Sequence, residues 1–103
     1  MAKFVLIYRD GETPPAPSPD VMETWMAWFG QLGDAVVELG APLGASATVA
    51  SDGTSSEGTG TDPVTGYTVV QAATMDDAVA LANGCPGLAT GGSVTLHQVH
   101  EMG

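Results

Sequence analysis

Basic residues are almost absent from this chain. Lys3 and Arg9 are the only lysine and arginine among 103 residues, against twelve aspartates and glutamates, so the formal net charge is −10. Proteins that bind nucleic acids neutralise phosphates with lysine and arginine, and anionic membrane surfaces attract the same residues. The composition therefore excludes nucleic acid and membrane surfaces as expected partners, and is typical of a chain kept in solution by its charge.

Cysteines and long apolar segments are also scarce. Cys85 is the single cysteine, so no internal disulfide is expected, which agrees with a reducing compartment. No apolar run approaches the roughly 18 residues of a membrane-spanning helix. Residues 4–8 are apolar but are followed at once by Arg9 and Asp10, which predicts a first strand rather than a signal peptide and hence a cytoplasmic protein.

The pattern of apolar and turn-forming residues predicts six elements in the order β-α-β-β-α-β. Strands are expected at residues 3–9, 43–50, 67–72 and 93–100, and helices at residues 19–39 and 75–82. Residues 10–17 and 51–66 are rich in glycine, proline, serine and threonine and are expected to be loops. The alternation indicates an α+β domain with the ferredoxin-like arrangement, a four-stranded antiparallel sheet with two helices on one face.

Each predicted helix has a start and a stop signal. Pro19 begins the first helix, and Gly40 is expected to end it. Its apolar stripe is Met22, Trp25, Met26, Phe29, Leu32, Val36 and Val37, with Trp28 on the flank. Thr74 is expected to cap the second helix, which Asn83 ends.

The first strand predicts a homodimer. Phe4, Leu6 and Tyr8 alternate with Val5 and Ile7, and both sets are apolar, so both faces of the sheet should be covered. Two helices cover only one face, so a second copy is the expected cover for the other. We find no internal repeat, and expect residues 1–103 to form one domain.

Few residues are candidates for catalysis, and no catalytic residue is assigned. His97 and His100 are the only histidines, and their spacing on a strand sends them to opposite faces. His97 is the candidate general base, although a strand histidine held by a backbone carbonyl is the favoured alternative. No cluster of cysteine and histidine predicts a metal site, and no nucleotide fingerprint predicts a cofactor.

A set of aromatic residues suggests a ligand pocket. Tyr8, Trp25, Trp28 and Tyr67 are expected near one another, where the first helix covers the sheet, and Arg9 is placed to pair a ligand carboxylate. Ordinary core packing and a surface ion pair are the alternative interpretations. The glycine-rich loop 53–66 is interpreted as a flexible connection, or alternatively as a lid over a dimer cleft.

Over nearly its whole length the chain resembles the YCII-related family of the dimeric α+β barrel superfamily. The resemblance is carried by FVLIY (4–8), TGYTVV (65–70), DAVALA (77–82), Cys85-Pro86 and GGSV (91–94). It implies a ferredoxin-like monomer, sheet-to-sheet dimerisation and a cleft between the sheet and the first helix. Some members carry a catalytic histidine on that helix, where this chain has Trp25 and Trp28, and related folds act on lactones and phenols.

Three functions are compatible with these features of the sequence. The first is a homodimer that binds a small aromatic or lactone-like molecule without catalysis. The second is an enzyme of the lactone isomerase or dehydrohalogenase type that uses His97 as its base. The third is a protein–protein interaction module that docks partners on the open face of the sheet.

Overall fold

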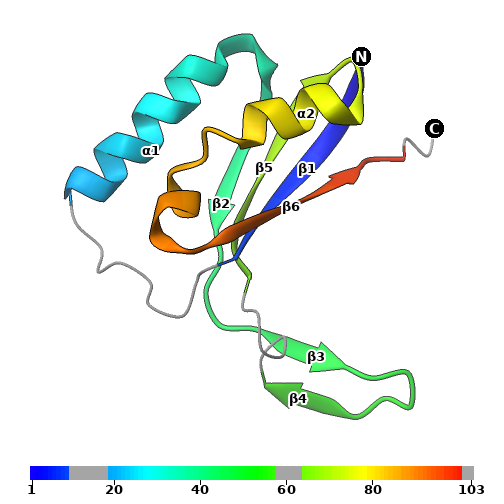
Figure 1. The fold of residues 1–103 in the computed structure, drawn as a ribbon. Coiled ribbons are helices and arrows are strands. Elements are labelled where there is room, and N and C mark those ends of the chain that lie inside the picture. The colour runs from blue at the N-terminus through cyan, green and yellow to red at the C-terminus, as the bar shows by residue number, and fades with distance from the viewer. Residues whose placement is uncertain (10–18, 58–63, 101–103) are drawn as a thin grey trace.

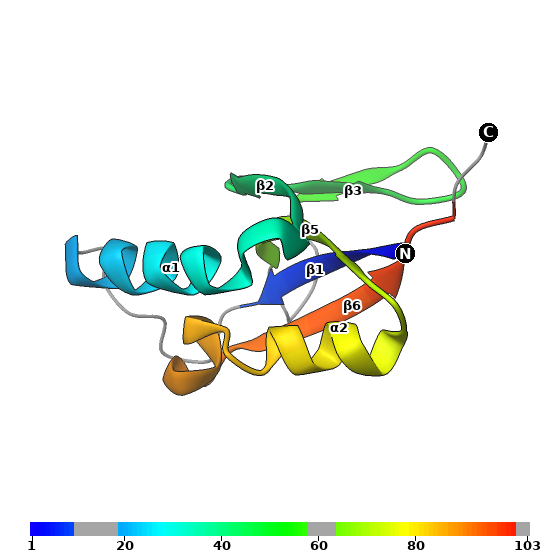
Figure 2. The same ribbon diagram turned by 90° about the horizontal axis from the view of Figure 1, so that it is seen from above.

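The computed structural model describes residues 1–9, 19–57 and 64–100 of the chain. Within these residues the main layer is a four-stranded antiparallel sheet of order β2-β5-β1-β6, and two α-helices lie on one of its faces (Figures 1 and 2). The sheet strands are β1 (Ala2–Arg9), β2 (Val36–Pro42), β5 (Val64–Ala72) and β6 (Ser93–Gln98), and the helices are α1 (Pro19–Leu32) and α2 (Met75–Ala82). This is an α+β fold compatible with the ferredoxin-like class that the sequence predicts.

Alternation along the two central strands creates the core. Phe4, Leu6 and Tyr8 of β1 are buried under the helices, and Val70 of β5 is buried beside them. The register pairs Phe4 with Val70 and Leu6 with Thr68, so these side chains share one face of the sheet. Burying such apolar side chains contributes about 1.5–3 kcal/mol each.

The first helix is shorter than the sequence predicts. The expected helix over residues 19–39 ends at Leu32, and a 3₁₀ turn (Gly33–Ala35) leads into β2. Gly33 takes a φ of +54°, which breaks the helical path. Val36 and Val37, which the predicted helical stripe includes, are β-branched residues that lie in β2 instead, where Val36 pairs with Val70. Gly40 lies inside β2 and does not end a helix.

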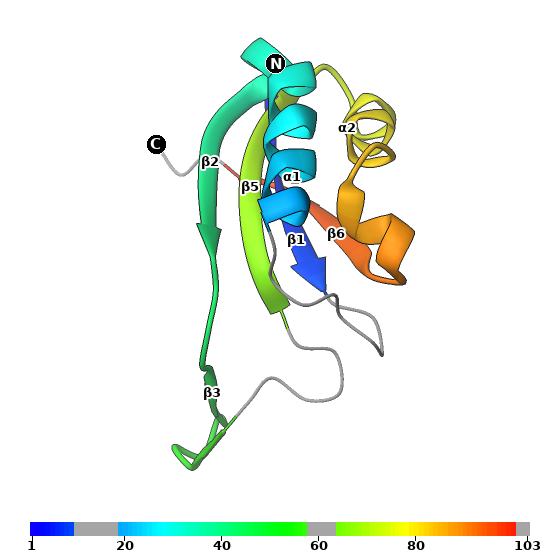
Figure 3. The same ribbon diagram turned by 90° about the vertical axis from the view of Figure 1, so that its left-hand side faces the viewer.

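The middle of the chain forms a hairpin that the sequence does not predict. The expected strand over residues 43–50 is replaced by β3 (Ala47–Val49), which pairs with β4 (Ser55–Glu57) inside the expected loop. At its turn the Asp52 carboxylate accepts hydrogen bonds from the Thr54 backbone N–H and hydroxyl, which lower the pKa of Asp52. The hairpin projects from the end of the sheet (Figure 3). Residues 58–63 and the expected loop at 10–17 lie outside the described residues.

The second helix agrees with the prediction. The Thr74 hydroxyl caps α2 by accepting a hydrogen bond from the Asp77 backbone N–H, and Ala78 and Ala82 face the core. A short 3₁₀ helix, η2 (Pro86–Thr90), then leads to β6. Among the described residues, no helix has the length and apolar character to cross a membrane.

Candidate ligand pocket

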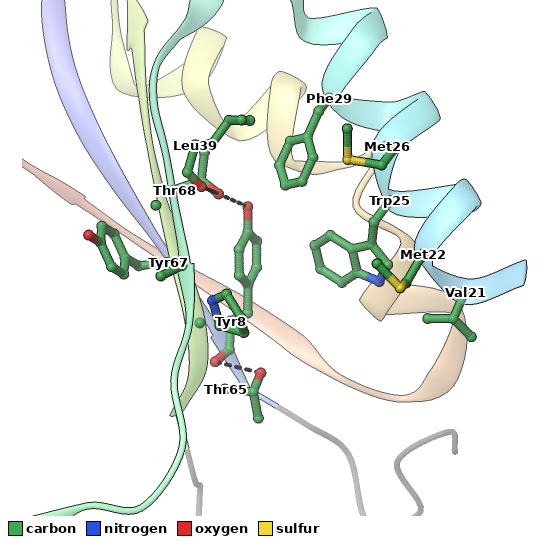
Figure 4. Close-up of a pocket in the computed structure, with 14 residues that line it drawn as sticks. Tyr8, Val21, Met22, Trp25, Met26, Phe29, Leu39, Thr65, Tyr67 and Thr68 are labelled. Atoms are coloured by element: carbon green, nitrogen blue, oxygen red, sulfur yellow. Dashed lines mark hydrogen bonds between the residues drawn. The ribbon is translucent and has the colours of Figure 1, made fainter. Parts of the chain in front are cut away.

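A cavity of about 370 Å³ opens between α1 and the strands β2 and β5 (Figure 4). Its size falls in the range of small-molecule sites. Almost all of its surface is apolar. The lining residues are Tyr8, Val21, Met22, Trp25, Met26, Phe29, Leu39, Gly40, Ala41, Pro42, Thr65, Gly66, Tyr67 and Thr68.

The helical wall of the cavity follows from spacing along α1. Val21, Trp25 and Phe29 are four residues apart, so they form one face turned toward the sheet. Met22 and Met26 lie one position further round and are 69% and 60% exposed. Flexible thioether side chains at such a rim can adapt to ligands of different shape.

The opposite wall depends on an irregularity in β2. Its pairing with β5 shifts register between Glu38 and Ala41, and Gly40 there takes a φ of +76°. A Cβ at Gly40 would overlap the Tyr67 carbonyl oxygen and lie 2.7 Å from its carbon. Only glycine fits both the backbone angle and the close approach. The bulge leaves the Leu39 carbonyl to accept the Thr68 hydroxyl at 2.9 Å.

Aromatic rings pack edge to face beside the cavity. The Tyr8 and Trp25 ring centroids are 5.0 Å apart at an interplanar angle of 78°, and Trp28 lies 5.8 Å from Trp25. Such pairs contribute about 0.5–1.5 kcal/mol beyond area burial. Trp28 is only 4% exposed and does not line the cavity, so it supports Trp25 from behind.

The structure separates the predicted site residues into three groups. Tyr8 and Trp25 line the cavity with their rings, and Trp28 packs behind them. Arg9 is next to Tyr8 on β1 but belongs to the other face of the sheet, because it shares the orientation of Ile7. Tyr67 lines the cavity with its backbone, while its ring lies on the far side of the strand (Figure 4). Its hydroxyl donates to Glu38 at 3.1 Å, which raises the pKa of Tyr67.

The histidines and the cysteine do not reach the cavity. His97 pairs with Val5 on the face of the sheet away from the helices and is exposed, and it is absent from the lining. His100 is also exposed. Cys85, which directly precedes η2, is buried, and burial raises the pKa of its thiol. A buried thiol with a raised pKa is a poor nucleophile.

The sequence does not predict the part of the lining that comes from β2, nor Val21, Thr65 and Gly66. The sequence predicts a helix end at Leu39, Gly40 and Pro42, and this prediction is wrong because these residues belong to β2 and face the first helix across the cavity. The predicted strand over residues 67–72 includes Thr68, but the sequence indicates no role for its hydroxyl. In the described part of the chain, no lysine, arginine, histidine, aspartate or glutamate lines the cavity, and no group of three or more metal-binding side chains occurs.

Tyr8 is expected to ionise late, because burial raises its pKa from 10.0 to about 12. The folded state then keeps a proton that the unfolded chain releases. Stability from this group should therefore be fully present below pH 10 and fall as the pH approaches about 12. Alkaline absorbance titration should show late ionisation in wild type that Tyr8→Phe removes. Glu38→Gln should lower the pKa of Tyr67 and leave that of Tyr8 unchanged. If both tyrosines of the wild type titrate with the usual pKa of 10.0, this account is contradicted.

No protein-family model, no curated protein and no solved structure matches this chain. The resemblance to the YCII-related family therefore stays a prediction, and function is argued from the geometry alone.

Proposed function

We propose that this chain binds a small, neutral, aromatic molecule in the cavity between α1 and β5, and does so without catalysing a reaction. The observation that carries the proposal is the chemistry of the lining. Among the described residues that line the cavity, tyrosine is the only ionisable type, and burial raises the pKa of Tyr8 to about 12. A group that keeps its proton at neutral pH is a poor general base.

The same lining favours neutral over charged ligands. Removing a carboxylate from water is costly unless a cation or several donors replace its hydration. Arg9, the predicted partner for a carboxylate, belongs to the other face of the sheet. The walls instead offer the edges and faces of Tyr8, Trp25 and Phe29, which suit a flat ring.

A matched pair of probes tests this proposal. Naphthylmethanol and naphthoate differ mainly in charge, and each is added to the protein during thermal unfolding and calorimetric titration. At a hundred times its dissociation constant a ligand stabilises by roughly 2.7 kcal/mol, a shift of several degrees for a domain of this size. We expect this shift with the alcohol and little or none with the carboxylate. Tighter binding of naphthoate, or no binding of any neutral aromatic, would contradict the proposal.

The enzyme alternative required His97 in the same cleft as the ligand. Its exposed position on the opposite face supports binding over catalysis by that residue within one chain. Substrate-dependent turnover that His97→Ala abolishes would reverse this preference.

We further propose that two copies of the chain pack through the sheet faces that the helices leave open, as the dimeric α+β barrel implies. Val5, Ile7 and Val69 form a half-buried apolar strip on this face. Lys3 and Arg9, the only strong bases in the chain, share that face by strand alternation. Two copies of a chain with a net charge of −10 repel each other, and this repulsion is weakest where the bases lie.

A charge placed in the centre of this strip should prevent the dimer. Ile7→Glu would place a carboxylate inside the apolar strip of each copy, and we expect the cost of removing this charge from water to weaken association by at least tenfold. Val79→Glu is the matched control, because Val79 is 42% exposed on α2 at the helical side. Sedimentation equilibrium should give a dimer for wild type and the control, and a monomer for Ile7→Glu. A wild type that stays monomeric would favour the interaction-module alternative.

A further inference from the structure

The hydroxyl groups at the back of the pocket are linked in one direction. The Leu39 carbonyl oxygen can only accept a hydrogen bond, so the Thr68 hydroxyl donates to it over 2.9 Å. Thr68 then has only lone pairs left for its neighbour. The Tyr8 hydroxyl therefore donates its single proton to Thr68 Oγ1 over 2.7 Å (Figure 4).

The third side-chain hydroxyl that lines the pocket also donates its proton within the protein. The Thr65 hydroxyl donates to the Tyr8 main-chain carbonyl oxygen at 3.3 Å. Three hydroxyl-bearing residues line the cavity, and each donates its hydroxyl proton to another protein atom: Tyr8, Thr65 and Thr68. The lone pairs of these oxygens are what the side-chain hydroxyls still offer to a ligand.

A pocket of this kind treats donors and acceptors differently. A ligand O–H or N–H group finds an acceptor at the Tyr8 oxygen. A ligand carbonyl beside these hydroxyl groups has given up its hydrogen bonds with water and faces only lone pairs. The lost hydrogen bonds are therefore not replaced there. Among the described lining residues, the remaining side-chain donor is the Trp25 indole N–H, which lies on the Met22 side of the ring and away from the Tyr8 hydroxyl (Figure 4).

We propose that the pocket selects neutral aromatic molecules that carry a hydrogen-bond donor, and rejects those of the same shape that present only an acceptor. This inference rests on the proposed function, because it concerns the ligand of the same cavity. It separates phenol-like and alcohol-like ligands from lactone-like ones, which the sequence analysis keeps as candidates beside small aromatic molecules.

The test compares naphthyl ethanol with acetonaphthone, its ketone, which has nearly the same shape. Calorimetric titration of wild type should give about tenfold tighter binding for the alcohol, as expected for one uncompensated polar group. Thr68→Val removes the acceptor of the Tyr8 proton and so frees that proton for the ligand. The preference for the alcohol should then fall to about parity, whereas Thr68→Ser keeps the hydroxyl chain and should keep the preference.

The outcomes separate this inference from the proposed function. Equal binding of alcohol and ketone to wild type would overturn the donor rule while ligand binding in the cavity stands. A preference that Thr68→Val leaves unchanged would also overturn it, since the hydroxyl chain would not be its source. Failure of both molecules, together with failure of naphthylmethanol, would overturn the proposed function and this inference with it.

Discussion

Gly40→Ala should lower the free energy of unfolding by about 3 kcal/mol or more, because two separate costs add at this position. The φ of +76° is unfavourable for any residue with a Cβ. The new methyl group would also overlap the Tyr67 carbonyl, which belongs to the neighbouring strand and has no free rotation to escape. Natural domains have about 5–15 kcal/mol of stability in total, so this loss would be a large fraction of it.

Two other glycines of the same region supply matched controls. Gly33 has a φ of +54° and open space around it, so Gly33→Ala should cost only the backbone strain of about 1–2 kcal/mol. Gly30 lies inside α1 with no atom nearby, so Gly30→Ala should stabilise the protein by up to about 1 kcal/mol. Urea denaturation of the three variants should give this order. Equal losses for Gly40→Ala and Gly33→Ala would show that β2 does not approach Tyr67 as described.

Substitution of the two tryptophans should separate stability from binding. Trp28 is 4% exposed and lies in the core, so Trp28→Ala should cost about 3–5 kcal/mol. Trp25 is half-buried at the cavity wall, so Trp25→Ala should cost less stability but weaken naphthylmethanol binding by at least tenfold.

Denaturant unfolding and calorimetric titration of the same samples measure the two effects. Trp28→Phe keeps an aromatic ring in the core and should retain both the fold and most of the affinity. This variant keeps the comparison informative if Trp28→Ala does not fold. A larger loss of affinity from Trp28→Phe than from Trp25→Ala would contradict the assignment of Trp25 to the pocket wall.

The sequence predicts the fold class because its strongest signals are local and consistent. Residues 4–8 and 67–72 are dense in strand-forming residues, and Thr74 caps α2 as expected. The end of α1 was missed because Val36 and Val37 continue the helical spacing, while Gly33 fixes the true end through a backbone angle that spacing does not reveal. The pairing of β2 with β5, which is a tertiary contact, makes residues 36–42 a strand instead of a continuation of the helix.

The candidate site was predicted only in part for a related reason. Tyr8 and Trp25 were expected at the cavity and line it. Tyr67 was expected with them, but Val69 and Val70 are both apolar, so the pattern of β5 does not tell which face is buried. The register with β1 decides it: Tyr67 pairs with Ile7 on the face away from the helices. The β2 wall requires the bulge at Gly40, which no local pattern indicates.

The central claim is that a neutral aromatic ligand occupies the cavity between α1 and β5. The most direct test is the two-dimensional amide spectrum of ¹⁵N-labelled protein during titration with naphthylmethanol, because its two tryptophans give two indole N–H signals. We predict large shifts for the Trp25 indole and for the backbone of Met26 and Gly66, with little change at His97 on the opposite face. Shifts centred on β6 and His97, or none at saturating ligand, would contradict the account.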